Sequence, residues 1–214
     1  MMFIPGIRER QISARIAILV PIVLCVLSAC AASQSTRAPA SIEIQDAVGF
    51  TITEQARIGA NVREDYEGAL MLLEQGRHEL GVELLETVAA EAPQFSAPRI
   101  DLGVAYHRAG DLEAAERNLL LALEQNFDHP IAHNELGIVY RKMGRFSEAR
   151  QSYENALAIY PGYHFARRNL AVLCDLYLAD LSCALENYEA YMATVPGDAE
   201  ASMWITDIRN RSGQ

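Results

Sequence analysis

The residues of this sequence that could do chemistry are few, and they do not form a catalytic set. His129 and His133 are four positions apart, a spacing that suits two metal ligands, but Pro130 lies between them and no acidic or cysteine partner has ligand spacing. The sequence also contains no Gly-rich phosphate loop and no nucleophile elbow. We therefore predict no enzyme activity, no catalytic residue, no cofactor, no metal site and no small-molecule substrate.

The composition favours helices and limits the class of partner. Half of the 214 residues are hydrophobic, aromatic residues make up only 7%, and the formal net charge is -10. Frequent Ala, Leu and Glu favour helix over sheet. An acidic chain is a poor partner for nucleic acid, because phosphate neutralisation requires a basic surface. We therefore expect an all-α protein that does not bind nucleic acid.

The first 29 residues have the organisation of an export signal. Arg8, Arg10 and Arg15 precede an unbroken apolar run at residues 16–27. This run is shorter than the roughly 20 apolar residues that a membrane-spanning helix requires. A positive flank, a short apolar run and small residues after it are typical of a secretory signal peptide.

The end of the apolar run, Leu27-Ser28-Ala29-Cys30, resembles the lipobox of bacterial lipoproteins. The resemblance implies cleavage before Cys30 and acylation of this residue, so that several acyl chains anchor the mature protein to the envelope, facing the periplasm. Ala31 follows where Asp would indicate retention at the inner membrane, and under enterobacterial-type sorting this implies the outer membrane. The alternatives are an ordinary signal peptide and a signal anchor with an incidental cysteine.

Residues 30–52 are expected to form the lipidated cysteine and a flexible tether, because residues 31–41 are small and polar. Residues 41–44 and 49–52 could be short extended segments, but neither is long enough to predict a sheet. Thr53 is expected to cap a long first helix that continues to Leu73 and shields the front of the fold.

A repeat of 34 residues organises the rest of the chain. Leu-Gly-Val-Ala-Tyr at 102–106 returns as Leu-Gly-Ile-Val-Tyr at 136–140, and Gly110 returns as Gly144 at the same offset. A fixed period of this length indicates stacked two-helix units. Tight turns between the helices require the positive φ that glycine adopts at Gly110 and Gly144.

The repeat resembles the tetratricopeptide repeat (TPR), whose pattern is Leu-Gly-x-x-Tyr followed by Gly, Ala, an aromatic residue and Pro. The unit at 130–163 carries nearly the full set, from Leu136 and Gly137 to Pro161. The resemblance implies an all-α solenoid of about four units within residues 53–198. The predicted units are 62–95, 96–129, 130–163 and 164–198, the last with one residue inserted near Ala179.

Residues 199–214 are predicted to form a capping helix and tail. Ala201, Trp204, Ile205 and Ile208 share one face of this helix, and polar residues occupy the other face. A solenoid end requires one apolar side against the stack and one polar side toward water. Trp204 is therefore predicted to pack in the core rather than in a ligand site.

Two cysteines remain outside the predicted signal and anchor, Cys174 and Cys183. In the repeat frame they lie near the end of one helix and near the start of the next, and a short antiparallel turn brings such positions together. Because the periplasm is oxidising, we predict a disulfide across the irregular turn. The alternative is two small buried hydrophobic residues.

The resemblance implies that the first helices of the units line a concave groove that binds a peptide or a partner's helix. The candidate groove residues are Tyr66, His107, Arg108, Asn134, Arg141, Lys142, Arg168 and Asn169. The four basic residues Arg108, Arg141, Lys142 and Arg168 suit an acidic segment or a C-terminal carboxylate. Alternatively, they are solvated helix ends that compensate the helix dipole.

The Lys/Asn clamp of chaperone-binding TPR proteins is not supported, because only Asn134 is of the right kind at the corresponding positions. We therefore expect a non-enzymatic scaffold, lipid-anchored in the bacterial envelope, that binds a protein partner. TPR lipoproteins resembling this chain act as pilotins or as adaptors for cell-wall enzymes. One alternative is an integral structural subunit of an envelope transport or motility complex. Another is a peptidoglycan-active enzyme or its inhibitor.

Overall fold

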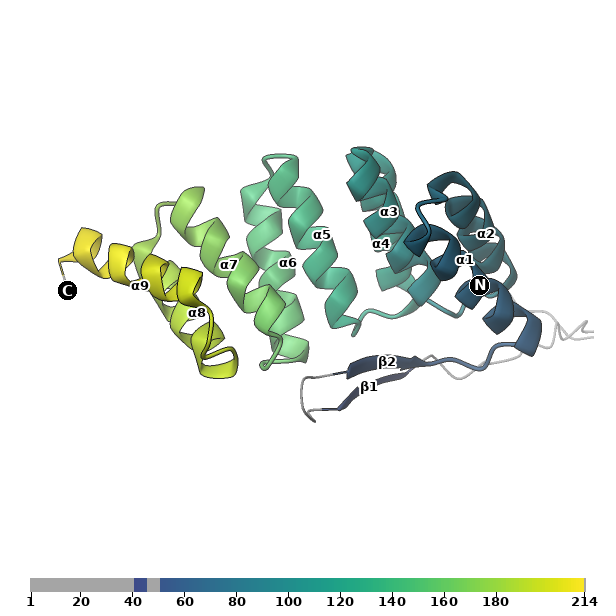
Figure 1. The fold of residues 1–214 in the computed structure, drawn as a ribbon, viewed down its shortest axis with the longest axis horizontal. Coiled ribbons are helices and arrows are strands. Elements are labelled where there is room, and N and C mark those ends of the chain that lie inside the picture. Colours follow the sequence, from purple (N-terminus) through teal and green to yellow (C-terminus); the bar gives the residue numbers. More distant parts are fainter. Residues whose placement is uncertain (1–40, 46–50, 214) are drawn as a thin grey trace, which may run out of the picture. The chain divides into compact units, whose positions relative to one another are not determined.

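The structure is a computed structural model that describes residues 41–45 and 51–213 (Figure 1). The predictions for the signal peptide and for Cys30 concern residues outside this described part. The described residues form a β-hairpin followed by nine helices, of which the first eight pair in chain order. None of the described helices is both long enough and apolar enough to span a membrane.

The helices form four antiparallel pairs and one final helix. The pairs are α1 (Ala60–Glu74) with α2 (His78–Glu91), α3 (Ala97–Ala109) with α4 (Leu112–Gln125), α5 (Pro130–Lys142) with α6 (Phe146–Ile159), and α7 (His164–Leu176) with α8 (Leu181–Thr194). The last helix is α9 (Ala199–Ser212). Each pair packs on the next pair along the chain, so the fold is the predicted all-α solenoid.

The first helices of successive pairs lie on the inner side of the stack. Helix α3 approaches α5, and α5 approaches α7, whereas such approaches between the second helices are weaker or absent among the described residues. In the view of Figure 1, α5 accordingly lies in front of α6. A stack whose first helices converge is curved, and the first helices line its concave face.

Close helix packing within a pair depends on glycine. A Cβ atom on Gly137 would lie 2.5 Å from Cε1 of Tyr153, and a Cβ atom on Gly103 would lie 2.5 Å from Cγ of Leu119. Tyr153 and Leu119 are both fully buried. The glycines of α3 and α5 therefore leave the space that a large side chain of the paired helix fills.

The turns between paired helices follow the repeat as predicted. Gly76, Gly110 and Gly144 all have positive φ, and they are spaced by the repeat length. The fourth turn has Ala179 at φ 52°, one position later than the repeat length predicts. The inserted residue is therefore accommodated at this turn, in a conformation that favours glycine.

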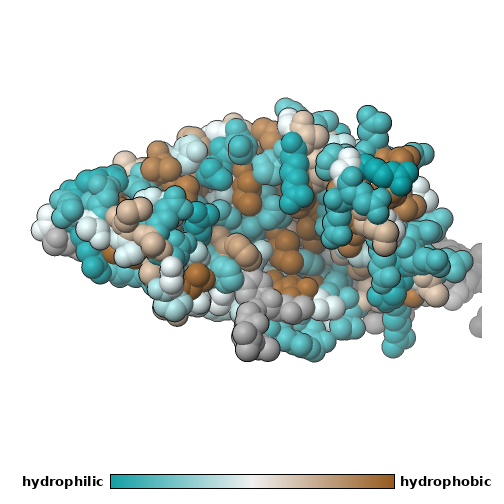
Figure 2. Space-filling view, viewed as in Figure 1, coloured by the Kyte–Doolittle hydropathy of each residue, from teal (hydrophilic) through white to brown (hydrophobic). Residues whose placement is uncertain are grey.

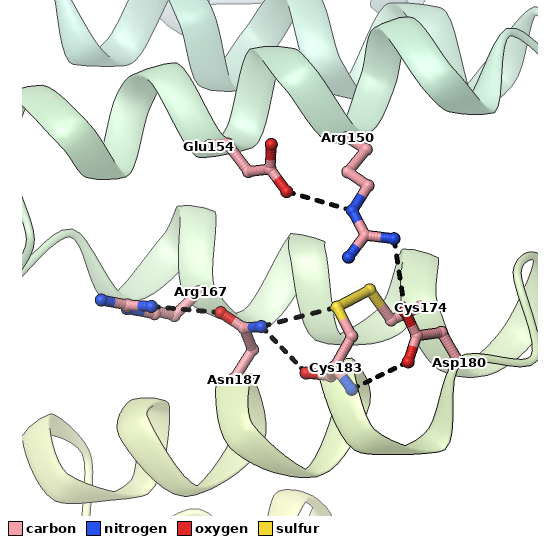
Figure 3. The surroundings of a disulfide bond; sticks show 7 residues. All are labelled: Arg150, Glu154, Arg167, Cys174, Asp180, Cys183 and Asn187. Carbon is pink, nitrogen blue, oxygen red and sulfur yellow. Dashed lines mark hydrogen bonds and ion pairs between the residues drawn. A yellow bond between two sulfur atoms is a disulfide. The ribbon is translucent and has the colours of Figure 1, made fainter.

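A disulfide joins the two helices on either side of this fourth turn (Figure 3). Cys174 is buried near the end of α7, and Cys183 lies in the first turn of α8, with a Cα–Cα distance of 5.9 Å. The Asp180 carboxylate accepts a hydrogen bond from the Cys183 backbone N–H (3.1 Å) and pairs with Arg150 of α6 (3.3 Å). The turn is thus held by a covalent bond, a helix cap and an ion pair.

The hairpin was not predicted from the sequence. Strands β1 (Ser41–Gln45) and β2 (Thr51–Gln55) are antiparallel, with Ile44 opposite Ile52. The Glu54 carboxylate accepts hydrogen bonds from the backbone N–H of Ser96 (3.1 Å) and Ala97 (2.9 Å), and from the Ser96 hydroxyl (2.9 Å). Glu54 thereby caps the N-terminus of α3 from a distant part of the chain, where a carboxylate is favourable.

The predicted long first helix is wrong. Thr53 lies in β2, and α1 begins only at Ala60, after Gly59. The alternation of partly buried and exposed side chains over residues 52–55 fits a strand with one side toward the solenoid, and Ile52 packs against the main core. The front of the solenoid therefore has no extended α1 to shield it.

The final helix closes the other end of the stack. Ala201, Ile205 and Ile208 of α9 are buried, and Trp204 is partly buried with its ring centroid 5.2 Å from that of Tyr188. Asp198 caps α9 by accepting hydrogen bonds from the backbone N–H groups of Glu200 and Ala201. This arrangement matches the expected capping helix, with Trp204 packed against the core.

We predict that Gly137→Ala lowers the free energy of unfolding by about 1–3 kcal/mol, because the new methyl group overpacks against Tyr153. Gly68→Ala in α1 is the matched control, since its Cβ would meet only Leu84 at 3.7 Å. It should raise stability by up to about 1 kcal/mol, because alanine favours helix. Urea denaturation measures both changes, and equal effects at the two glycines would contradict the packing argument.

Candidate partner-binding groove

The predicted groove residues all lie on the first helices of the pairs. Tyr66 is on α1, His107 and Arg108 are on α3, Asn134, Arg141 and Lys142 are on α5, and Arg168 and Asn169 are on α7. Because these helices line the concave face, the structure brings the predicted residues to one side of the stack. Figure 2 shows hydrophobic residues near the middle of the face in view, above the hairpin, in a surface that is otherwise mostly hydrophilic.

Polar side chains link neighbouring first helices along the groove. The Tyr66 hydroxyl donates a hydrogen bond to the Asp101 carboxylate of α3 (2.6 Å). The Asn169 amide of α7 donates to the Asn134 side-chain oxygen of α5 (2.9 Å), and the Asn134 amide donates to Glu135 (3.0 Å). Tyr66, Asn134 and Asn169 therefore have a structural role in the groove, whatever they bind.

Sequence reasoning missed two carboxyl groups in this groove, those of Asp101 and Glu135. Burial raises the pKa of Asp101 to about 6, although the Tyr66 hydrogen bond and the charge of Arg108 both act to lower it. Burial also raises the pKa of Glu135, against the effects of Asn134 and Arg108. Neither carboxylate has an ion-pair partner among the described residues. The sequence feature that could have identified both carboxyl groups is the repeat, because Asp101 and Glu135 occupy equivalent positions on α3 and α5.

A cluster of cationic side chains lies at the C-terminal ends of α3 and α5. The pKa of His107 is lowered, first by burial and then by the charges of Lys142, Arg141 and Arg108. His107 and Arg108 lie in the last turn of α3, and Arg141 and Lys142 lie in the last turn of α5, which contacts α3. Arg108 and Lys142 are exposed, whereas Arg141 donates a hydrogen bond to the Tyr177 hydroxyl (3.4 Å). We call Arg108, Arg141 and Lys142 the cationic cluster; His107 lies beside them and, with its lowered pKa, is neutral at pH 7.

Arg168 is held differently from the cationic cluster. Its guanidinium pairs with Glu200 of α9 (3.5 Å) and lies 5.2 Å from the centroid of the Trp204 ring. Part of its charge is therefore balanced by α9, and Arg168, unlike the other three basic residues predicted for the groove, contacts the capping helix.

An apolar cavity opens beside these charged groups, between α1, α2 and α3. Its volume is about 550 Å³, and Leu70, Leu73, Val82 and Val104 supply much of its wall. Asp101 lines this cavity and also a second one of about 300 Å³ between the hairpin and the first helices. The concave face thus offers apolar space, partly buried carboxylates and a cationic cluster in one region.

The histidines singled out in the sequence are structural. The His133 Nε2–H donates to the Phe127 carbonyl oxygen (2.9 Å), and burial lowers the pKa of His133. Burial also lowers the pKa of His129, to about 4. Both are neutral at pH 7. Among the described residues, the one group with metal-ligand spacing is Cys174, Asp180 and Cys183, and its two sulfur atoms are bonded to each other.

Comparison with known proteins agrees with this architecture. Two family models, each described as tetratricopeptide repeat, match residues 130–163 and 72–135. The chain folds as a tetratricopeptide-repeat solenoid. A protein O-mannosyl-transferase of Caenorhabditis elegans is 25% identical over 115 residues, or 54% of this chain, and the TPR chain spans only 15% of that relative's length.

Solved structures share the fold at low sequence identity. Pseudomonas aeruginosa PilF is 18% identical with a TM-score of 0.64, covering 71% of the TPR chain and 68% of PilF. The first TPR of Spaghetti (RPAP3), bound to an HSP90 peptide, is 18% identical with a TM-score of 0.53. That similarity covers 56% of the TPR chain and 98% of the RPAP3 chain. At these identities the similarity establishes the fold alone.

We predict that Asp101→Asn stabilises the protein at pH 7.5 more than at pH 4, by about 1–2 kcal/mol. The folded state raises the pKa of Asp101 from 3.8 to about 6, so stability falls as pH rises between these values in the unsubstituted protein. Asparagine removes this loss and can still accept the Tyr66 hydrogen bond. Urea denaturation at both pH values measures the difference. If Asp101→Asn changed the free energy of unfolding equally at both pH values, folding would not raise the pKa of Asp101.

Proposed function

We propose that this protein is a non-enzymatic scaffold, anchored by lipid at Cys30 to the bacterial envelope, whose concave groove binds a peptide or helix of a protein partner. The observation that carries the proposal is the groove itself. An apolar cavity of about 550 Å³ and the cationic cluster lie on the same face of a TPR solenoid. TPR solenoids serve as protein-binding scaffolds, and the RPAP3 structure holds a peptide.

The anchor is supported by the sequence. The basic flank, the short apolar run and the Leu27-Ser28-Ala29-Cys30 motif resemble the export and acylation signals of lipoproteins. Ten residues, 31–40, separate Cys30 from Ser41, the first residue that the structure describes. We place the groove in the periplasm at the outer membrane, where it assembles or positions an envelope machine for pili, secretion or the cell wall.

The cationic cluster supports a partner segment that carries carboxylates. Arg108 and Lys142 are exposed and are not in ion pairs among the described residues, in contrast to Arg168. Guanidinium and ammonium groups in this arrangement favour acidic side chains or a C-terminal carboxylate. A permanently assembled structural subunit of a transport or motility complex is the alternative, and recovery of a single stoichiometric complex would favour it.

We predict that Cys30→Ala abolishes incorporation of labelled palmitate, because no acceptor thiol remains at the motif. The measurement is palmitate labelling in a Gram-negative host, followed by membrane fractionation. Labelling that persists in this variant would contradict the anchor.

We also predict that Arg141→Glu with Lys142→Glu lowers the yield of partner crosslinked in membranes by roughly tenfold, because charge reversal repels a carboxylate. Arg117→Glu is the matched control, since Arg117 is exposed on α4, a second helix. An equal loss in the control, or no loss in the double variant, would contradict binding in the groove.

A further inference from the structure

The cavity between α1, α2 and α3 differs in charge from the rest of the groove. Its apolar wall is completed by Ala105 and Tyr106, and the carboxylates Glu74, Glu79 and Asp101 lie around it. Among the described residues that line it, Arg108 and His78 are the basic ones. An apolar space bordered mainly by carboxylates is suited to a side chain or segment that is both apolar and cationic.

We propose that this cavity binds an aliphatic side chain of the partner segment together with a neighbouring lysine or arginine, whose cation pairs with Asp101. This inference rests on the proposed function and specifies the ligand chemistry at the α1 end of the groove. The apolar wall of the cavity contacts the aliphatic side chain, and the carboxylates attract the cation. Because lysine and arginine have long aliphatic stems, they can contact the wall and reach Asp101 together.

Asp101 is well placed for this role. It lies on α3 between the cavity and the hairpin side of the groove, because it lines both cavities of the concave face. The Tyr66 hydroxyl fixes one carboxylate oxygen at 2.6 Å and thereby orients the group. No ion pair within the described residues neutralises it, and a cation from outside would supply the missing charge.

Arg108 determines the orientation in which the partner segment binds. Its side chain lines the cavity and also belongs to the cationic cluster, so the carboxylate-bordered cavity meets the basic ends of α3 and α5 at this residue. A partner segment would place its apolar and basic residues toward α1 and its carboxylates toward α5. The groove is therefore selective for a segment of divided charge, which a uniformly acidic peptide does not satisfy.

The test uses the full chain and a displayed library of random 12-residue peptides. We expect enriched peptides to carry Leu, Ile or Met beside Lys or Arg.

For a selected peptide, replacing the basic residue by norleucine should weaken binding by roughly tenfold, and Asp101→Asn should abolish that difference. Val104→Phe, which fills the cavity, should weaken the parent peptide to a similar extent. Glu124→Gln, at an exposed position on α4, is the control and should leave the dissociation constant unchanged.

The outcomes separate this inference from the proposed function. One outcome would overturn the cavity inference and leave groove binding intact. In it, the selected peptides are acidic throughout and bind less tightly to Arg141→Glu, but Asp101→Asn and Val104→Phe do not change their binding. Peptides whose binding is unaffected by all three substitutions would overturn both. Loss of binding in Val104→Phe alone, with norleucine tolerated, would show an apolar pocket without a cation requirement and would also overturn the inference.

Discussion

Close packing of the two helices within each layer is the constraint on which the rest of this structure depends. Gly137 and Gly103 leave room for Tyr153 and Leu119, both fully buried, and any side chain at these glycines would push the helices apart. The layers bury their apolar faces against each other, and the main core accordingly runs from Ile100 to Ile208. The curvature of the concave face follows from this packing.

The groove combines structural and binding roles in the same helices. Asn134 and Asn169 join α5 to α7, and Tyr66 joins α1 to α3, so these polar residues fix the spacing of the first helices. The residues left for a partner are those at the helix ends and around the cavity, such as Lys142 and Val104. Rigid spacing of the first helices keeps these groups in position, which lowers the entropic cost of binding.

The repeating part of the fold could be predicted because its signals are local. The Gly110 and Gly144 turns and the Gly137 packing site recur at a fixed offset, and the irregular fourth turn was located near Ala179. The hairpin could not be predicted in this way. Its attachment depends on Glu54 and Ser96, which are 42 positions apart, and Glu54 lies outside the predicted repeat units. An isolated two-stranded hairpin is marginal, and such tertiary contacts are what stabilise it.

The candidate site was predicted only in part, for a related reason. Basic residues near helix ends, such as Arg108 and Lys142, can be placed on one face from periodicity alone. The burial of Asp101 and Glu135 depends on how neighbouring layers pack, and acidic residues on helices are usually solvated. Likewise, the pairing of Arg168 with Glu200 depends on where α9 docks.

The most direct test of the account is site-specific photocrosslinking of the full chain in membranes. A photoreactive amino acid would replace either Lys142 on the concave face or Leu121, which is 39% exposed on α4. The account predicts a discrete crosslinked partner from position 142 and none from position 121. A partner captured at position 121 and absent at position 142 would show that the second helices, and not the groove, form the binding surface.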